Sequence, residues 1–340
     1  MKIMVYEARE DEKEAIRLQA NRLGIEIELC SEVPSMKNVA MTKGCEGVSI
    51  LGQGKIDKRL LYDYWLNGVR YLSTRTIGYD HIDLNYAKCL GIQVCNARYE
   101  PNGVADFTVM MMLMCLRQYK QAMWRGHVND FSLTGLQGKE MRSMTIGVIG
   151  TGMIGAQVIK NLSGFGCRIL AWSRKKNSEI EDLVTYVDLD TLYAKSDIVT
   201  LHLALTPETE HIINAESISK MKDGVMIINC ARGELADIHA LVEGIENQKI
   251  GALGIDTMEG DQGIVHKDHR VDILSNRDWF YLHQFRNVIM TQHMAFYTEE
   301  AVDSMVSCGI GGIYDMKKTG TCRTELTNHL NPIVNMAVTL

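Results

Sequence analysis

The chain has 340 residues, 46% of them hydrophobic, and a formal net charge of −6. This length exceeds the size at which a single core usually keeps growing, so two domains are expected. The modest charge and the lack of a basic block argue against a nucleic-acid partner and favour a small-molecule ligand.

Cysteine usage and hydropathy narrow the cellular setting. The nine cysteines are scattered singly without a C-x-x-C pair, which favours a reducing cytosol over a disulfide framework, and no zinc-ligand spacing is present. The N-terminal run becomes charged at Glu7 and predicts a strand start, not a signal peptide. The most apolar run, Phe107–Leu116, is too short to cross a bilayer. We therefore expect a cytoplasmic protein with no membrane contact and no metal.

The first hundred residues alternate short apolar runs with helical spacing, which predicts a βα domain with a parallel sheet. Strands are expected at Ile3–Tyr6, Ile25–Leu29, Val48–Leu51, Tyr71–Ser73 and Gln93–Cys95, and helices at Glu10–Leu23, Lys58–Leu66 and Asn85–Leu90. One long apolar helix is then predicted from Asn102 to Trp124.

The rest of the chain again alternates strands and helices, and we interpret it as a doubly wound dinucleotide fold. Its strands are expected at Thr145–Ile149, Arg168–Trp172, Ile198–Leu201, Val225–Asn229, Gly254–Ile255 and Val288–Met290. Its helices are expected at Leu189–Ala194, Ala215–Met221 and Ile238–Gln248. A final helix is predicted from Thr298 to Met316, followed by a polar tail.

A G-x-G-x-x-G motif joins the strand Thr145–Ile149 to the helical segment Met153–Leu162. The first glycine allows the turn, the second lets the backbone approach a pyrophosphate, and the third lets the helix pack against the strand. The phosphates would bind at the helix N-terminus, where N–H groups and the helix dipole favour an anion. The predicted site is the backbone of Gly150, Gly152, Met153, Ile154 and Gly155. The alternative is an ordinary glycine-rich turn.

The residues after the second strand of this fold indicate which dinucleotide binds. An NAD site usually has an Asp or Glu there for the ribose 2′-hydroxyl. This chain instead has Ser173, Arg174, Lys175 and Lys176. A hydroxyl followed by cations suits a 2′-phosphate, because each cation can pair with its charge. We therefore expect NADP(H) to be favoured, with NAD(H) possible; the alternative interpretation is a solvated charged loop.

Three stretches at strand ends carry groups suited to chemistry. Arg232 follows the strand Val225–Asn229, and its planar fork can hold a carboxylate in two parallel hydrogen bonds. His293 follows the strand Val288–Met290, and a His orientated by a carboxylate is a suitable general acid or base. The candidate acids are Asp256, Glu259 and Asp261. Each of these residues taken alone could be an ordinary polar surface group. All three stretches occurring together at strand ends favours a functional site.

These motifs resemble the D-2-hydroxyacid dehydrogenase family over nearly the whole chain, and are most similar to D-lactate dehydrogenases of the vancomycin-resistance type. The resemblance rests on the glycine motif, on His293 within an H-x-A-F-Y-T run, and on the segments Ser73–Asp83, Tyr99–Asp106, Asn229–Asp237 and Asp256–Asp261. It implies two doubly wound parallel-sheet domains with a cleft between them. Residues 1–100 and 298–340 would form a flavodoxin-like catalytic domain, and residues 101–297 a Rossmann cofactor domain.

The resemblance also implies roles for the three chemical groups. Arg232 would bind the substrate carboxylate and keto oxygen, and His293 would protonate the developing alkoxide. The family places the acid that orientates the His, normally Glu, five residues after the aspartate numbered Asp256 here. This chain departs from the family because that position is Asp261. Asp261 is favoured for the role, and Glu259 is the alternative.

Other residues would complete the substrate and cofactor sites by the same resemblance. The backbone amides of Ile77 and Gly78 would hold the substrate carboxylate, and Tyr99 and Tyr297 would line the pocket. The residues near the nicotinamide would be Cys230, Ala231 and Asp256. A homodimer joined through the cofactor domains is also implied, with the predicted helix 102–124 as a candidate interface element.

The implied reaction is reduction of a 2-keto acid to the (R)-2-hydroxy acid, with pyruvate as the first choice. After the strand Val48–Leu51 the chain offers Leu51 and Gln53 before Lys55, which favours a small or apolar substrate side chain over a dicarboxylate. Longer aliphatic or aryl keto acids such as 2-ketoisocaproate are the alternative substrates. A non-catalytic dinucleotide-sensing protein of the same fold is the alternative function.

Overall fold

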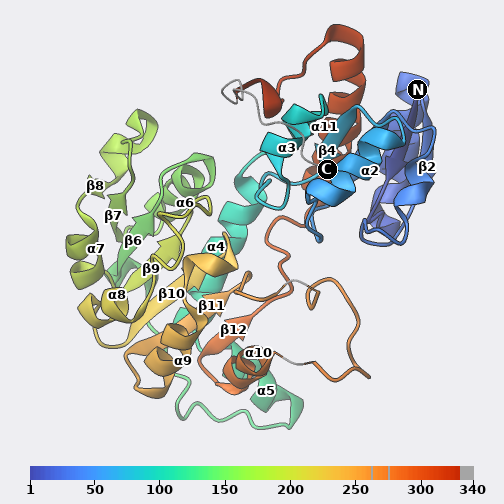
Figure 1. The fold of residues 1–340 in the computed structure, drawn as a ribbon. Helices are drawn as coiled ribbons and strands as arrows, with labels where there is room; N and C mark the ends of the chain where they lie inside the picture. Colours follow the sequence, from blue (N-terminus) through green and yellow to red (C-terminus); the bar gives the residue numbers. More distant parts are fainter. Residues whose placement is uncertain (262, 275, 330–340) are drawn as a thin grey trace. The chain divides into compact units, whose positions relative to one another are not determined.

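The computed structural model describes residues 1–261, 263–274 and 276–329 (Figure 1). The chain divides into two compact units, one formed by Met1–Glu100 with the segment from Tyr297 onward, and the other by Pro101–Phe296. Each unit is built on one parallel β-sheet with helices on its faces. The predicted fold class, two parallel-sheet α/β domains, is confirmed.

The first unit has a five-stranded sheet in the order β2-β1-β3-β4-β5, which is the flavodoxin-like order. Its strands are β1 (Lys2–Val5), β2 (Glu26–Leu29), β3 (Gly47–Ile50), β4 (Tyr71–Thr74) and β5 (Gln93–Asn96). Its helices are α1 (Lys13–Leu23), α2 (Lys58–Leu66), α3 (Leu84–Cys89) and α11 (Glu299–Thr319).

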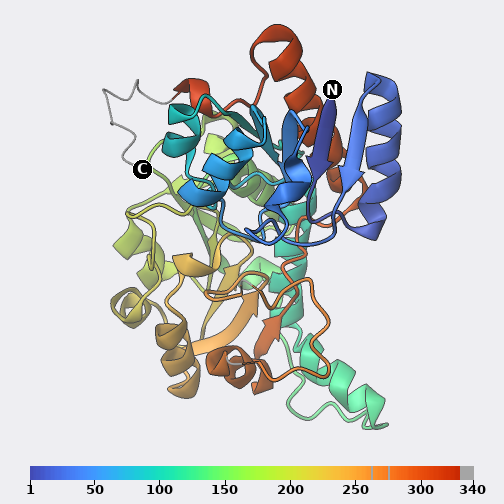
Figure 2. The same ribbon diagram turned by 45° about the vertical axis from the view of Figure 1, so that its right-hand side comes forward.

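Side-chain alternation along β1 divides the first unit into two apolar layers, because successive residues of a strand point to opposite faces. Ile3 and Val5 pack with residues of α1 and α11. Met4 and Tyr6 pack on the other face with residues of α2 and α3. Helix α11 comes from the end of the described chain and lies beside α1 and the N-terminal strands, as Figures 1 and 2 show.

The second unit has a seven-stranded sheet in the order β12-β11-β10-β9-β6-β7-β8. Its strands are β6 (Thr145–Ile149), β7 (Arg168–Trp172), β8 (Thr185–Tyr186), β9 (Ile198–Leu201), β10 (Val225–Asn229), β11 (Ile250–Ile255) and β12 (Val288–Met290). Its helices are α4 (Asn102–Leu116), α5 (Tyr119–His127), α6 (Met153–Ser163), α7 (Leu189–Lys195), α8 (Ala215–Lys220), α9 (Ile238–Glu246) and α10 (Arg277–Gln284).

The strand order of this sheet reverses at β6. From β6 the chain passes to β7 on one side and later to β9 on the other, and all the strand pairs are parallel. In such sheets, ligands bind outside the carboxyl ends of the strands at the point of reversal. The glycine motif follows β6 and therefore lies at this point.

The predicted single helix from Asn102 to Trp124 is wrong, because the structure has two helices there. α4 ends at Leu116, and α5 begins at Tyr119 after Gln118 adopts a left-handed backbone with φ of 53°. The Leu116 carbonyl accepts a hydrogen bond from the N–H of Lys139 at 3.0 Å, so a distant segment caps the end of α4. Periodicity alone could not reveal this, since the apolar pattern continues across the break.

Other differences from the predicted elements are smaller. The strand β8 and helix α10 were not predicted, and β11 begins at Ile250, four residues before its predicted start at Gly254. The predicted helix from Glu10 begins with a 3-10 turn, and α1 itself starts at Lys13. The predicted tail extends beyond residue 329 and there lies outside the described residues.

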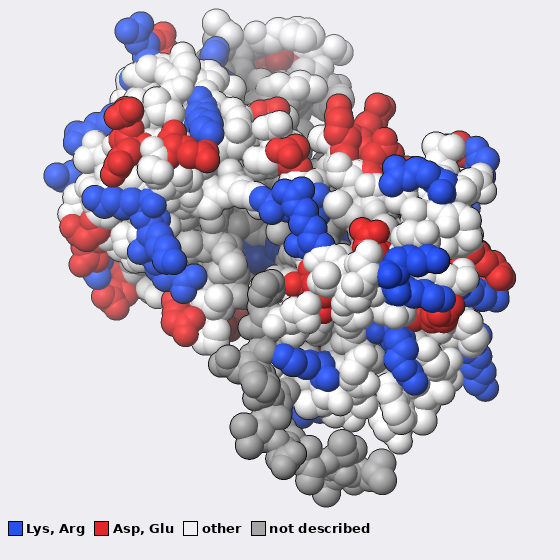
Figure 3. All heavy atoms as spheres, turned by 90° about the horizontal axis from the view of Figure 1, so that it is seen from above, with Lys and Arg blue, Asp and Glu red and all other residues white. Residues whose placement is uncertain are grey.

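Two further properties concern membrane-spanning helices and surface charge. No helix within the described ranges is long and apolar enough to cross a membrane. Lys and Arg side chains are interspersed with Asp and Glu side chains over the face seen in Figure 3. Such mixing differs from the single-sign stripe of a nucleic-acid surface.

Candidate active site

The three glycine positions of the motif after β6 differ in why they lack a side chain. Gly150 has φ of +98°, and a side chain there would collide with the carbonyl of His202. A side chain at Gly155 would collide with the carbonyl of Gly150, so α6 packs directly on the turn. A Cβ at Gly152 would meet no described atom within 4 Å. The fold itself therefore does not require a glycine at Gly152, whereas a phosphate at the N-terminus of α6 would.

The loop after β7 is tied to this glycine turn. The Tyr186 hydroxyl donates to Thr151 Oγ1 at 3.1 Å, and Asn177 Nδ2 donates to the Thr151 carbonyl at 3.2 Å. The Asn177 N–H in turn donates to the Tyr186 hydroxyl at 2.9 Å. The predicted 2′-phosphate residues lie in the loop that these bonds hold: Ser173 is half-buried, and Arg174 and Lys175 are exposed.

The loop of Arg232 is shaped by Asn229 at the end of β10. The Asn229 side chain accepts from the N–H of Ala231 at 3.1 Å and donates to the carbonyl of Arg232 at 2.8 Å. The next residue, Gly233, packs so closely on the Met258–Glu259 backbone that any side chain there would collide with it. The structure thus brings the half-buried Arg232 beside the loop that follows β11.

Asp256, at the end of β11, joins that loop to the segment after β12. It is 2% exposed, and its carboxylate accepts from the Thr291 hydroxyl at 2.6 Å and from the N–H groups of Met294 and Ala295 at 2.8 Å each. These bonds flank His293, whose φ of 56° is unusual for a residue with a side chain. Asp256 therefore fixes the loop that presents His293, and its predicted role beside the nicotinamide stays a prediction.

The two candidate acids have different partners. The Asp261 carboxylate lies 3.3 Å from Nδ1 of His293, measured to Oδ2, with the side chains 15% and 32% exposed. The Glu259 carboxylate instead lies 3.2 Å from Nε2 of His211. The shorter aspartate therefore does reach the His from the position where the family has a glutamate.

The predicted carboxylate-binding loop of the first unit presents two amides. The carbonyl of Ile77 accepts from Asn96 Nδ2 at 2.7 Å, and the carbonyl of Gly78 accepts from the Thr76 hydroxyl at 2.6 Å. Within the described part of the chain, the N–H groups of Ile77 and Gly78 have no acceptor. With the carbonyls held and the amides unpaired, the loop suits an anion.

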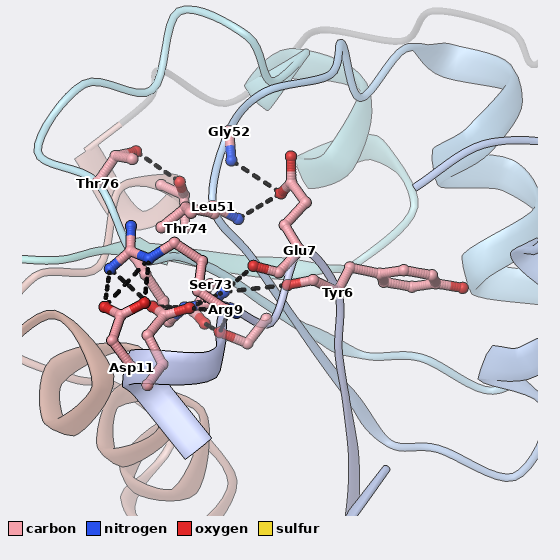
Figure 4. A network of polar contacts seen from close by, with 12 residues as sticks. Tyr6, Glu7, Arg9, Asp11, Leu51, Gly52, Ser73, Thr74 and Thr76 are labelled. Carbon is pink, nitrogen blue, oxygen red and sulfur yellow. Dashed lines mark hydrogen bonds and ion pairs between the residues drawn. The ribbon is translucent and has the colours of Figure 1, made fainter. Parts of the chain in front are cut away.

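The segment after β3 is organised by a buried carboxylate (Figure 4). Glu7 is 4% exposed, and its carboxylate accepts from the backbone N–H groups of Leu51 and Gly52, as Figure 4 shows. It also accepts from the backbone N–H of Gln53. Burial raises the pKa of Glu7 above its ordinary value, against the lowering effect of these donors. Glu7 thus fixes the predicted side-chain pocket at Leu51 and Gln53.

The remaining predicted residues are found in two settings. Tyr99 is half-buried, and Tyr297 is exposed with the Arg9 guanidinium 5.1 Å from its ring centre. Cys230 is buried, which raises the pKa of its thiol, while Ala231 is half-buried. Exposure and contacts alone do not assign a role to any of these four residues, so their predicted roles stay predictions.

The sequence analysis missed four residues whose side chains bond to the segments of the candidate site. Each is distant in sequence from its bonding partner, and no motif identifies any of them: Glu7, Asn96, His211 and His266. His266 Nε2 lies 3.0 Å from the His293 carbonyl. Glu7, His211 and His266 have a positive φ, which the sequence does not reveal.

The sequence is similar to those of known proteins. The family model for the NAD binding domain of D-isomer specific 2-hydroxyacid dehydrogenases matches residues 109–295. The chain is 39% identical over 329 residues to an aromatic 2-oxoacid reductase of Clostridium sporogenes, covering 96% of this chain and 99% of the relative. It is 36% identical over 328 residues to a D-lactate dehydrogenase of Escherichia coli, covering 96% and 100% of the two chains.

The fold is likewise similar to solved structures. It matches the NAD-complexed form of a D-isomer specific 2-hydroxyacid dehydrogenase from Lactobacillus delbrueckii ssp. bulgaricus with a TM-score of 0.81 and 29% identity. That match covers 96% of this chain and 100% of the other chain.

Proposed function

Because this chain belongs to the D-isomer specific 2-hydroxyacid dehydrogenase family, we propose that it reduces a 2-keto acid to the (R)-2-hydroxy acid with a nicotinamide dinucleotide. The observation that carries the proposal is the pairing of His293 with Asp261, 3.3 Å from Nδ1 to Oδ2. The loop of Arg232 packs against the segment that leads to Asp261. An imidazole orientated by a carboxylate suits proton delivery to an oxygen that gains charge, and a guanidinium suits stabilisation of that charge.

Each of the three side chains has a distinct task in this reaction. Asp261 accepts the Nδ1 hydrogen of His293, which leaves Nε2 to hold the proton that goes to the substrate oxygen. Arg232 binds the carboxylate and stabilises the charge on the keto oxygen. The dinucleotide, when bound, supplies the hydride to the keto carbon.

The first unit supplies the substrate-binding groups in this proposal. The unpaired N–H groups of Ile77 and Gly78 bind the substrate carboxylate, and their paired carbonyls support this orientation. Tyr99 and Tyr297 line the pocket for the substrate side chain. The second unit is the dinucleotide-binding domain, where Gly150, Gly152, Met153, Ile154 and Gly155 hold the pyrophosphate, and Cys230, Ala231 and Asp256 lie near the nicotinamide.

The cofactor we favour is NADPH. The exposed cations Arg174 and Lys175 follow β7, where NAD sites usually carry an acid. The ties from Tyr186 and Asn177 to the glycine turn support a fixed place for this loop. Replacing Arg174 and Lys175 together with Ala should raise the KM for NADPH about tenfold or more and leave the KM for NADH nearly unchanged. An equal effect on both cofactors would contradict the preference.

The substrate we rank first is pyruvate, followed by keto acids with longer aliphatic or aryl side chains. Leu51, 5% exposed, is apolar, and the sequence has no Lys or Arg between it and the exposed Lys55. The names of the relatives support both ranks, since one is an aromatic 2-oxoacid reductase and another a D-lactate dehydrogenase. A best substrate with a second carboxylate, such as 2-ketoglutarate, would contradict this assignment.

We further propose that the protein is a cytoplasmic homodimer joined through the second unit. The segment that follows α4 exposes several large apolar side chains, among them Trp124, Phe131 and Leu133, the last two 79% and 83% exposed. Large apolar side chains exposed together in one segment are a feature of interaction surfaces. Replacing Phe131 and Leu133 with Ser should give a monomer by light scattering if this surface forms the dimer.

Turnover tests the function directly. The purified protein should oxidise NADPH, followed by absorbance, with pyruvate, phenylpyruvate or 2-ketoisocaproate, and should yield the (R) product on a chiral column. The change His293→Ala should lower kcat by roughly two to four decades. His211→Ala is the matched control, because His211 pairs with Glu259 and lies outside the proposed reaction. No turnover with any keto acid and either cofactor would favour a non-catalytic, dinucleotide-sensing protein.

A further inference from the structure

The first unit contains a pair of cysteines that the proposed reaction does not use. Cys95 is fully buried on β5, and Cys322 is half-buried in the segment that follows α11. Both thiols are free, and both sulfurs lie close to Gly312 of α11.

A glycine on α11 makes room for the two sulfurs. A Cβ added at Gly312 would lie 2.7 Å from the Cys95 sulfur and 3.7 Å from the Cys322 sulfur. The Cys95 sulfur therefore occupies the space that a side chain at this helix position would fill, and the Cys322 sulfur lies at van der Waals distance from that space. The contact is a built feature of the packing, since three separate segments of the chain converge to form it.

The surroundings shift the pKa values of the two thiols in opposite directions. The neighbouring Cys95 thiol, together with the backbone N–H of Thr324, lowers the pKa of Cys322 to about 7. The same pairing and burial raise the pKa of Cys95. At neutral pH about half of the Cys322 side chains are thus thiolates, the reactive form, while the buried Cys95 stays a thiol.

We propose that Cys95 and Cys322 form an oxidisable dithiol site that reacts with a hydroperoxide and closes to a disulfide. The Cys322 thiolate attacks one peroxide oxygen and the O–O bond breaks, which gives a Cys322 sulfenic acid and an alcohol or water. The Cys95 sulfur then displaces the hydroxyl group from Cys322, the S–S bond forms, and the Cys95 proton leaves with that hydroxyl group as water. Two thiols lose two electrons and the peroxide gains them.

The position of the site gives its oxidation a route to the amide loop described above. Asn96 follows Cys95, and its Nδ2 donates to the Ile77 carbonyl. Thr324 lies two residues after Cys322, and its hydroxyl donates to the Asn96 carbonyl at 2.6 Å. A shift of Cys322 toward Cys95 is thus transmitted to Asn96. Only this coupling to substrate binding rests on the proposed function; the disulfide itself does not.

Mass spectrometry of the full chain tests the site without any activity assay. After treatment with a few equivalents of hydrogen peroxide and alkylation of the remaining thiols, peptide mapping should show a Cys95–Cys322 crosslink in the wild type. Cys89→Ser is the matched control, because Cys89 is exposed, and it should give the same crosslink. Cys95→Ser should stop at a sulfenic acid on Cys322, which dimedone traps.

A second measurement keeps the proposal testable if the Cys95 variant does not fold. In the reduced wild type, iodoacetamide at pH 7 should alkylate Cys322 about tenfold faster than Cys89, and the rate should rise with a midpoint near pH 7. Gly312→Ala should slow the formation of the crosslink by separating the sulfurs. Oxidation of Cys89 before Cys322, or a crosslink from Cys95 to Cys308 instead, would overturn the proposal.

Discussion

Removing the charge of Asp261 tests how much the reaction depends on the His293 pair. At the observed 3.3 Å, an ion pair of unit charges is worth about 5 kcal/mol at an effective dielectric constant of 20. The side chains are 15% and 32% exposed, so we reduce this figure to about 2 to 3 kcal/mol. Asp261→Asn should therefore lower kcat by about two decades.

A conservative replacement separates the orienting role of Asp261 from simple structural damage. Asp261→Asn keeps the size of the side chain, but its amide can donate as well as accept, so it no longer holds the imidazole in one orientation. Asp261→Glu, with the longer acid of the family, should keep the wild-type kcat.

Glu259→Gln supplies the matched control for this experiment. Glu259 lies two residues from Asp261, has the same charge and pairs with His211, so its loss should leave kcat within about a factor of three. Steady-state rates of 2-keto acid reduction at one pH compare the wild type with the three variants. If Glu259→Gln lost as much activity as Asp261→Asn, or if Asp261→Asn kept the wild-type rate, the pairing of Asp261 with His293 would not contribute to catalysis.

Three further predictions follow from the second unit. Gly152→Ala should raise the KM for the dinucleotide at least tenfold with little change in Tm, whereas Gly155→Ala should lower the Tm, because only the second change meets the protein's own backbone. Asp256→Ala should lower the free energy of unfolding by about 3 kcal/mol in urea, because it leaves buried donors unpaired; a loss below about 1 kcal/mol would contradict its central role. Burial lowers the pKa of His202 to about 3, so the unfolded chain takes up this proton first as the pH falls below about 6.5. From pH 7 to 5 the wild type should therefore lose about 2 kcal/mol of unfolding free energy that His202→Gln does not lose.

The sequence predicted most strands of both sheets because their apolar runs are short and end at glycine or polar residues. Strands such as Arg168–Trp172 have the predicted bounds. The break in the helix before Gln118 could not be predicted, because the partner that caps α4 lies at Lys139. The short strand β8 carries too few residues for a pattern.

The candidate site divides in the same way. Motifs predicted Arg232, Asp261 and His293, which lie on loops after adjacent strands, and strand adjacency follows from the doubly wound order. The sequence left open which acid pairs with His293, since that depends on how the loop after β11 turns. The groups that hold the loops, such as Glu7 and Asn96, depend on contacts between distant segments and have no local pattern.

The first unit is formed by two segments that the second unit separates in sequence, and this affects folding during synthesis on the ribosome. Ile3 and Val5 of β1 pack against residues of α11, which are translated about three hundred residues later. The second unit is continuous and can fold as soon as it has emerged, since domains generally fold as units. The first sheet must wait with one apolar face uncovered, which makes the nascent N-terminal segment a target for chaperones. Truncation before α11 should therefore yield a chain that aggregates, although its second unit is complete.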